Sequence, residues 1–248
     1  MTPFLPSDSS VVVVAGRQSS GVGRGANAWL SPPGCAAFTL HLPSLSLHDS
    51  ALGRRVSILQ HLVALAVVEA AVGRSGYEGV DARIKWPNDL LHGESRAKLG
   101  GVLVKSSIMG KHVRCVVGCG VNLSNGKPTT CLNDLASAAA VKDGVEANLM
   151  STEEFIARVV TRLDRIMTDF EDSERREAIL KRYYDRWLHG EQRVTVKYEE
   201  SVSSSVEATV VGIDEYGFLK ALADDGRELT LHPDGNSFDL FSNLIVSK

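Results

Sequence analysis

The pattern of strand-like and helix-like runs changes at Gly190, and this change divides the chain into two regions of different secondary structure. Before Gly190, β-rich runs alternate with long helical patterns, whereas after it only short β-rich runs occur, separated by turns such as Asp225-Gly226. Short strands at such spacing favour a small barrel. The sequence therefore predicts a mixed α/β domain over 1–189 and an all-β domain over 190–248.

Hydrophobic periodicity predicts the elements of each domain. Val11–Ala15 is wholly apolar, which is typical of a strand buried on both faces. Ser151 followed by Glu154 forms a capping box at the start of an amphipathic helix. The expected strands are 11–15, 36–42, 82–86, 100–106, 113–118, 193–198, 206–213, 218–222, 228–231 and 238–246, and the expected helices are 51–72, 152–170 and 173–188.

Composition excludes several classes of protein. Lys and Arg number 27 and Asp and Glu number 30, so the net charge of −3 gives no bulk attraction to nucleic acid or to anionic membranes. The longest apolar stretch, 62–72, is shorter than the ~20 residues of a membrane-spanning helix. Neither a signal peptide nor a transit peptide is evident, and no cysteine pair has C-x-x-C spacing. We therefore expect a cytoplasmic protein with buried, free cysteines, and mitochondrial delivery stays open.

A glycine-rich stretch, 16–34, follows the first strand without helical or strand periodicity. Its segment 21–26 matches G-x-G-x-x-A, but Pro32 and Pro33 leave no room for the helix that a dinucleotide-binding loop requires. A mobile cover is the alternative, in which Arg24 holds a phosphate or carboxylate and Trp29 stacks on a ring. A disordered surface loop with a core tryptophan fits the same residues.

Polar residues also lie at the ends of three further strands. Asn88 and Asp89 end one strand, where they suit a nucleotide or a metal ion, although an Asx-turn explains them equally well. Lys98 precedes Gly-Gly, where an ammonium could stabilise a carboxylate or a charged phosphate, although most single lysines are only solvated. Gly118–Asn122 ends another strand with two glycines and an amide. Three such strand ends together indicate a binding site.

These motifs together resemble biotin protein ligases, and the C-terminal part resembles the same domain of eukaryotic holocarboxylase synthetases. The resemblance covers Val11 to Lys248 and implies a class II aminoacyl-tRNA synthetase-like α/β catalytic domain with a mixed β-sheet, followed by a small SH3-like β-barrel. It also implies two reactions: MgATP activates biotin to biotinyl-5′-AMP, and biotin then passes to a lysine of the carrier domain of a biotin-dependent carboxylase. The segments that carry the resemblance are 17–36, 84–90, 98–103, 118–122 and 232–239.

The resemblance also implies roles for individual residues. Lys98 corresponds to the catalytic lysine that contacts the biotin carboxylate and the adenylate phosphate, and Arg24 to the arginine that holds the activated intermediate. No residue is implied as a protein ligand of a metal ion. The implied biotin-binding positions are Gln18, Gly21, Val22, Gly23, Arg24, Lys98, Gly101, Gly118 and Gly120, and the implied ATP-binding positions are Trp29, Asn88, Asp89 and Asn122.

The sequence departs from the family pattern in three places. Val22 stands where a basic residue is usual, and Ala26 where glycine is common. The family also carries a segment before its first strand with a Ser-Thr pair for the biotin ureido ring, whereas only about ten residues precede Val11 here. One alternative is therefore a protein that binds biotin or a nucleotide without ligating. A lipoate-type ligase is another, although the turn at 85–89 and the C-terminal domain favour biotin.

Overall fold

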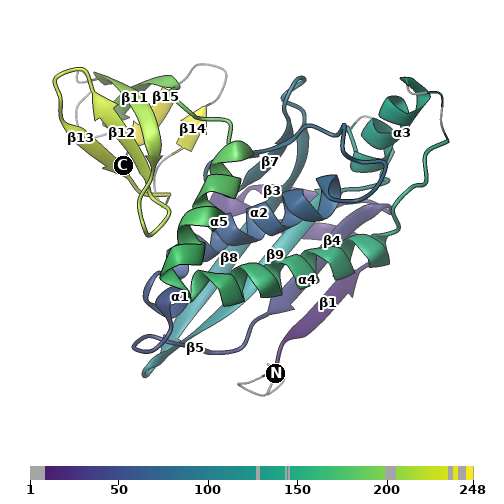
Figure 1. Cartoon of the computed structure of the whole chain (residues 1–248), viewed down its shortest axis with the longest axis horizontal. Coiled ribbons are helices and arrows are strands. Elements are labelled where there is room, and N and C mark those ends of the chain that lie inside the picture. The colour runs from purple at the N-terminus through teal and green to yellow at the C-terminus, as the bar shows by residue number, and fades with distance from the viewer. Residues whose placement is uncertain are drawn as a thin grey trace. The chain divides into compact units, whose positions relative to one another are not determined.

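The chain folds into two compact units in a computed structural model (Figure 1). One unit contains Met1–Ile84 and Asn88–Arg186, and the other contains Lys85–Pro87 and Trp187–Lys248. No helix among the described residues is long and apolar enough to cross a membrane. The structure describes residues 9–126, 129–142, 144, 146–198, 205–233, 237–239 and 244–247.

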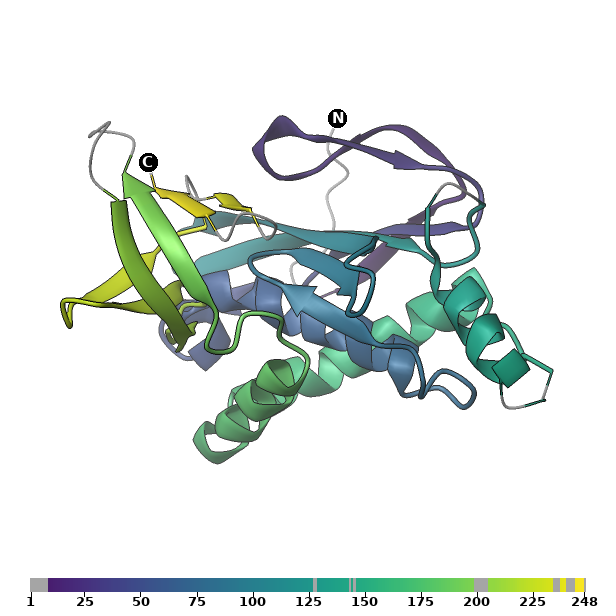
Figure 2. The same cartoon turned by 90° about the horizontal axis from the view of Figure 1, so that it is seen from above.

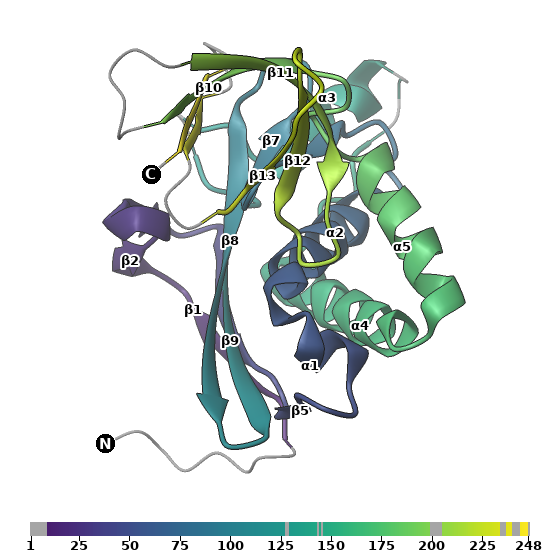
Figure 3. The same ribbon diagram turned by 90° about the vertical axis from the view of Figure 1, so that its left-hand side faces the viewer.

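A seven-stranded sheet forms the centre of the first unit. Its strands follow the order β1-β4-β9-β8-β7-β6, and β5 pairs with β9. The sheet has one helix-covered face, whereas a separate two-stranded hairpin, β2 with β3, lies on the other side (Figures 2 and 3). The strands are β1 (Val11–Ala15), β2 (Gln18–Val22), β3 (Ala28–Ser31), β4 (Cys35–His41), β5 (Leu45–Ser46), β6 (Ala82–Lys85), β7 (Asp89–His92), β8 (Lys98–Met109) and β9 (His112–Asn122).

The two central strands, β8 and β9, form one long antiparallel hairpin. They pair in unbroken register from Gly100 opposite Val121 to Met109 opposite His112. The turn between them includes Gly110, whose φ of +61° is left-handed and favours glycine. The structure confirms the two strands expected from the sequence and extends both of them.

The helices α2, α4 and α5 pack their apolar residues against one another and the sheet. Twelve of the fourteen residues of α2 are buried, as expected for a helix that is apolar on all sides. α4 instead buries one stripe, including Phe155 and Phe170. The helices are α1 (Ala51–Arg54), α2 (Leu59–Val72), α3 (Leu132–Lys142), α4 (Thr152–Phe170) and α5 (Ser173–Asp185).

Helix ends follow the capping residues of the sequence. The hydroxyl of Ser151 accepts a hydrogen bond from the Glu154 amide at 3.1 Å, which confirms the predicted cap of α4. Ser50 caps α1 in the same way through the Gly53 amide at 2.8 Å. The single helix expected over 51–72 is wrong, because Arg55 adopts φ −122° and ψ 37°, which breaks it into α1 and α2.

The burial of strand β1 differs from the prediction. Val12, Val13 and Val14 are 40%, 61% and 53% exposed, so the expectation of a strand buried on both faces is wrong. The reason is its place in the sheet, since β1 is an edge strand that pairs with β4. An unbroken apolar run cannot distinguish an edge strand from a central one.

The second unit is a six-stranded sheet of order β13-β12-β11-β10-β15-β14. Its buried Trp86 donates from its backbone amide to Nε2 of His189 at 3.0 Å and from its indole to the Gly217 carbonyl at 3.0 Å. The strand expected over 238–246 is two strands, with 240–243 outside the described residues. The strands are β10 (Arg193–Tyr198), β11 (Ser205–Ile213), β12 (Leu219–Ala223), β13 (Glu228–Leu231), β14 (Ser237–Asp239) and β15 (Leu244–Ser247). Closure of this sheet into a barrel stays a prediction.

Candidate active site

The glycine-rich stretch folds into the β2–β3 hairpin, so the expectation that it lacks strands is wrong. Gly21 pairs with Trp29, and the strands are joined by a short 3-10 turn over Arg24–Ala26. Gly25 in that turn has φ +63°, which favours glycine. The glycines hide the strand pattern in the sequence because they carry no side chain to alternate.

A row of small residues crosses the sheet beneath this hairpin. Asp89 on β7 pairs with Gly101 on β8, which pairs with Gly120 on β9, which pairs with Ala37 on β4. Paired residues in antiparallel strands point to the same face. The row therefore forms a shallow, side-chain-poor strip that ends in the carboxylate of Asp89.

The indole of Trp29 lies directly against the middle of this row. A Cβ at Gly120 would lie 2.7 Å from Cε2 of Trp29, far inside normal contact distance. A Cβ at Gly21 would lie 2.5 Å from the Trp29 carbonyl oxygen and 2.7 Å from Oε1 of Gln18. Glycine at 120 thus lets the hairpin approach the sheet this closely, whereas glycine at 21 avoids a clash within the hairpin itself.

Lys98 brings a positive charge to the same place. Its Nζ lies 2.6 Å from Oδ1 of Asp89 and 5.6 Å from the ring centroid of Trp29, a distance at which a cation and an aromatic ring attract. The Lys98 side chain is 47% exposed, so the ammonium can still reach a bound molecule. The structure therefore brings together three residues that are distant in the sequence.

Two asparagines hold the strand ends in place. Asn122 donates to the Lys98 carbonyl at 3.0 Å, and Asn88 donates to the Val102 carbonyl at 3.2 Å. Buried Asn125, which the sequence analysis missed, donates to Oδ1 of Asn122 at 3.2 Å. Its spacing of three residues after Asn122 is a weak signal that could have identified it.

The remaining predicted residues lie farther along the same elements. Gly118 is on β9, opposite Leu103, two residues from Gly120 and on the same face. Gln18 accepts a hydrogen bond from the buried Ser31 hydroxyl at 3.4 Å within the hairpin. The far end of the hairpin carries Val22, Gly23 and Arg24, and Val22 is 61% exposed.

A second missed contact fixes the exit of the hairpin. Gly34 has φ +88°, and a Cβ there would lie 2.7 Å from the Ser124 carbonyl carbon. The Ser124 amide donates to the Gly34 carbonyl at 2.8 Å, immediately after β9. The chain therefore leaves the hairpin in contact with the strand that carries Gly120 and Asn122.

Burial keeps the cysteine thiols protonated near neutral pH. The four cysteines are free and buried, as the sequence predicts. Burial raises the pKa of the Cys115 thiol to about 11 and that of Cys119 to about 12. Within the described part of the chain, no group of three or more His, Cys, Asp or Glu residues is placed to hold a metal ion.

The sequence matches families of known proteins over both units. Residues 3–122 match the Biotin/lipoate A/B protein ligase family, and residues 189–241 match the Biotin protein ligase C terminal domain. The fold resembles a solved biotin protein ligase from Aquifex aeolicus in complex with biotin and ATP, with a TM-score of 0.61 and 22% identity over 88% of this chain and 84% of that one.

Curated relatives extend the match to nearly the whole chain. It is 41% identical to a Homo sapiens biotin--protein ligase over 98% of its own length, but it spans only 32% of that protein. It is 37% identical to biotin--protein ligase 2 of Arabidopsis thaliana over 96% of its own length and 69% of that protein. The identity and the coverage of this second relative, together with the family matches, show that the chain belongs to the biotin protein ligase family.

Proposed function

We propose that this chain activates biotin with MgATP to biotinyl-5′-AMP and transfers biotin to a lysine of a carrier domain of a biotin-dependent carboxylase. The observation that carries the proposal is the Lys98 ammonium, held 2.6 Å from Asp89 beside the glycine row in a chain of this family. A site with one positioned cation and a side-chain-poor floor suits a ring system whose side chain ends in a carboxylate.

In the first reaction, a biotin carboxylate oxygen attacks the α-phosphorus of ATP, and the bond to pyrophosphate breaks. Both reacting groups are anionic, so they repel each other as they approach. Lys98 and Arg24 are proposed to offset this repulsion and the charge that develops on the phosphate. Positive charges act more strongly in a closed site from which water is excluded.

In the second reaction, the amine of the carrier lysine attacks the carbonyl carbon of the mixed anhydride, and AMP leaves. The β2–β3 hairpin is proposed to cover the intermediate and to protect it from water until the carrier arrives. Gly120 supports this role, because it lets the Trp29 indole of the hairpin lie against the sheet.

The other predicted residues divide between the two substrates. The hairpin and sheet positions that we propose to line the biotin pocket are Gln18, Gly21, Val22, Gly23, Gly101, Gly118 and Gly120. The positions that we propose to face ATP are Trp29, Asn88, Asp89 and Asn122. Asn88 and Asn122 act there mainly by fixing the strand ends, because their amides already donate to backbone carbonyls.

Magnesium enters this proposal with its substrate, as MgATP. Mg²⁺ prefers several oxygen ligands and keeps much of its water, so it is commonly bound through substrate phosphates and one or two carboxylates. Asp89 would be the carboxylate that makes such a limited contribution, alongside its ion pair with Lys98. The described residues offer no larger group of ligands around it.

We further propose that the catalytic domain spans 1–189 and that 190–248 forms an SH3-like barrel. Buried free thiols suit a reducing compartment, which supports a cytoplasmic location. A lipoate-type ligase is less well supported, because residues 189–241 match a domain named for biotin protein ligases. The other alternative is binding of biotin or nucleotide without ligation.

Carrier labelling tests the proposal directly. The chain is incubated with MgATP, biotin and a carrier domain, and the carrier is then probed with streptavidin. We expect labelling, and a loss of at least 100-fold in Lys98→Ala, because the positive charge at the reacting carboxylate is removed. Lys105→Ala is the matched control, since Lys105 is an exposed lysine on the same strand, and it should keep its activity.

Each alternative predicts a different outcome of this assay. A folded chain that binds biotin but leaves the carrier unlabelled would establish binding without ligation. Competition of the labelling by lipoate at concentrations similar to those of biotin would favour the lipoate-type reading. Equal labelling by Lys98→Ala and Lys105→Ala would exclude the proposed role of Lys98.

A further inference from the structure

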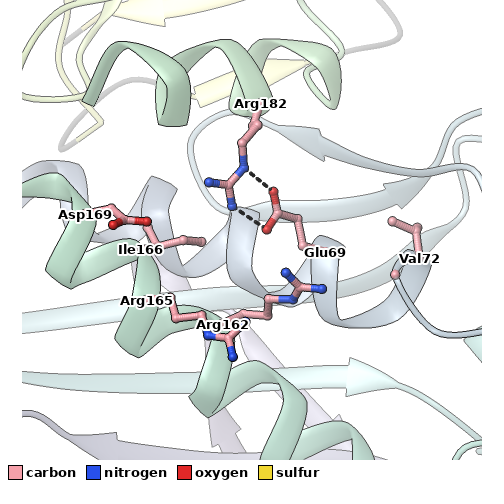
Figure 4. A pocket seen from close by; sticks show the side chains of 8 residues that line it. Glu69, Val72, Arg162, Arg165, Ile166, Asp169 and Arg182 are labelled. Carbon is pink, nitrogen blue, oxygen red and sulfur yellow. Dashed lines mark hydrogen bonds and ion pairs between the residues drawn. The ribbon is translucent and has the colours of Figure 1, made fainter. Parts of the chain in front are cut away.

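The helices of the first unit border a partly open hollow, separate from the glycine row. It has a volume of about 300 Å³ and is bordered by α2, α4 and α5 (Figure 4). Arginine is its most frequent lining residue: Arg162 and Arg165 come from α4 and Arg182 from α5. Two carboxylates, Glu69 and Asp169, also line it.

Both carboxylates are already neutralised by arginines of α5. Arg182 contacts Glu69 through two parallel hydrogen bonds, from Nε at 2.8 Å and from Nη2 at 2.6 Å. Arg175 donates to Asp169 at 2.7 Å. Among the described residues, the hydrogen bonds of both carboxylates therefore go to α5, and none of them goes to Arg162 or Arg165.

Arg162 and Arg165 are left without a hydrogen-bond or ion-pair partner among the described residues. They follow Arg158 at spacings of four and three, which places all three on one side of α4. Arg158 donates from Nε to the Ala70 carbonyl at 2.9 Å, which satisfies a donor but leaves its charge uncompensated. Like charges at this spacing repel, so an anion bound between these arginines would relieve that repulsion.

We propose that this hollow binds a small phosphate-type oxyanion through Arg162 and Arg165. The planar guanidinium group presents paired N–H donors that match the oxygens of phosphate. Arg162 is partly buried, which strengthens its interaction with an anion relative to one at the open surface. The volume has room for a phosphate or a phosphomonoester, but not for a whole protein segment of regular structure.

Thermal unfolding of the full chain tests this site, with inorganic phosphate and glycerol phosphate as probes and chloride at equal ionic strength as the reference. We expect either probe to raise the melting temperature of the wild type in a saturable manner. Arg162→Gln/Arg165→Gln should weaken the apparent affinity at least tenfold. A control that removes two exposed lysine charges elsewhere, Lys111→Gln/Lys142→Gln, should change it less than twofold.

The same variants provide a second readout without any probe. The arginine variant should melt at the same temperature as the wild type or higher, because repulsion on α4 is removed. Equal stabilisation of wild type and arginine variant by phosphate would overturn the proposal, as would equal stabilisation by chloride. The single variant Arg165→Gln, at an exposed position, gives the same test without disturbing the helix packing.

Discussion

The two faces of the central sheet differ in side-chain size, and neighbouring residues of one strand show the difference. On β9, Val117, Cys119 and Val121 are buried and fill the space beneath the helices. Gly118 and Gly120 alternate with them and leave space on the other face, where the Trp29 ring rests. One face is thus specified by the volume of its side chains, whereas the other is specified by their absence.

Substitution of Gly120 should have the largest effect on the face opposite the helices, where Trp29 lies against the sheet. Gly120→Ala places a Cβ 2.7 Å from Trp29 Cε2, so the hairpin must move away from the sheet. We expect a loss of carrier labelling of about 100-fold or more, since small displacements of a closed site have large effects on rate. Stability should fall by about 1–3 kcal/mol, which is usual for overpacking.

Gly118→Ala is the matched control for this variant. It lies on the same strand and the same face, but the nearest atom to its Cβ would be the Leu103 carbonyl oxygen at 3.8 Å, an ordinary contact. We expect nearly normal stability in Gly118→Ala, so stability is the quantity compared; activity is not, because Gly118 is itself proposed to line the biotin pocket. Equal losses of stability in the two variants, measured by chemical denaturation, would contradict the contact between Trp29 and Gly120.

The helix-covered face should respond in stability rather than in activity. Val117 is fully buried, so Val117→Ala should reduce the free energy of unfolding by about 2 kcal/mol and lower the melting temperature by roughly 4–8 °C. The neighbouring Val116 is 39% exposed, so Val116→Ala should change the free energy of unfolding very little. A carrier-labelling defect in Val117→Ala below its melting temperature would argue against this division between the two faces.

The helix-covered face could be predicted well from the sequence. The apolar spacing around Phe155 and the cap at Ser151 predicted α4, and the apolar runs at 100–106 and 113–118 predicted β8 and β9, because burial of volume leaves a pattern in the sequence. At Val11–Ala15 the strand was predicted but its burial was wrong, since an apolar run on an edge strand has the same sequence pattern as one on a central strand. The missed strand β7 is short and follows a proline turn.

The open face was predicted only in part, and for a physical reason. A glycine in the sequence shows that a position carries no side chain, but it does not identify the residue that fills the space. The contact of Gly120 with Trp29 could therefore not be inferred. The β2–β3 hairpin was missed on the same ground. Lys98 and Asp89 were each identified, but the ion pair between them depends on the pairing of β7 with β8, which the sequence does not specify.

The ion pair at the end of the glycine row should affect activity more than stability. In Asp89→Asn the side chain keeps its shape but loses the charge that holds Lys98. Because the lysine is 47% exposed, we expect a stability change below about 1 kcal/mol. The kcat for carrier labelling should fall about tenfold with a smaller change in the KM for biotin, since the lysine is less well positioned.

Asp224→Asn is the control for that substitution. Asp224 is paired with Arg193 at the surface of the second unit, and the pKa of its carboxyl is lowered mainly by this hydrogen-bonded arginine. Its loss should change neither kcat nor KM. A result in which both variants lose stability equally and neither loses activity would show that the Asp89–Lys98 pair is only a surface contact.

At alkaline pH, the thiols on the two faces of the sheet should affect the free energy of unfolding differently. This effect is smallest near neutral pH. Burial raises the pKa of Cys119, beneath the helices, from an ordinary 9 to about 12. Burial also raises the pKa of Cys35 on the other face, but hydrogen bonds to Ser31 and to the Val121 backbone oppose that rise. Above pH 9 the unfolded chain loses the Cys119 proton while the native chain keeps it. Stability should therefore fall with rising pH, by up to about 1.4 kcal/mol per pH unit for each such thiol, and no such loss is expected below pH 8. Denaturation at pH 8, 9 and 10 should show a flatter decline in Cys119→Ala than in Cys35→Ala; identical slopes would mean that burial on the two faces is equivalent.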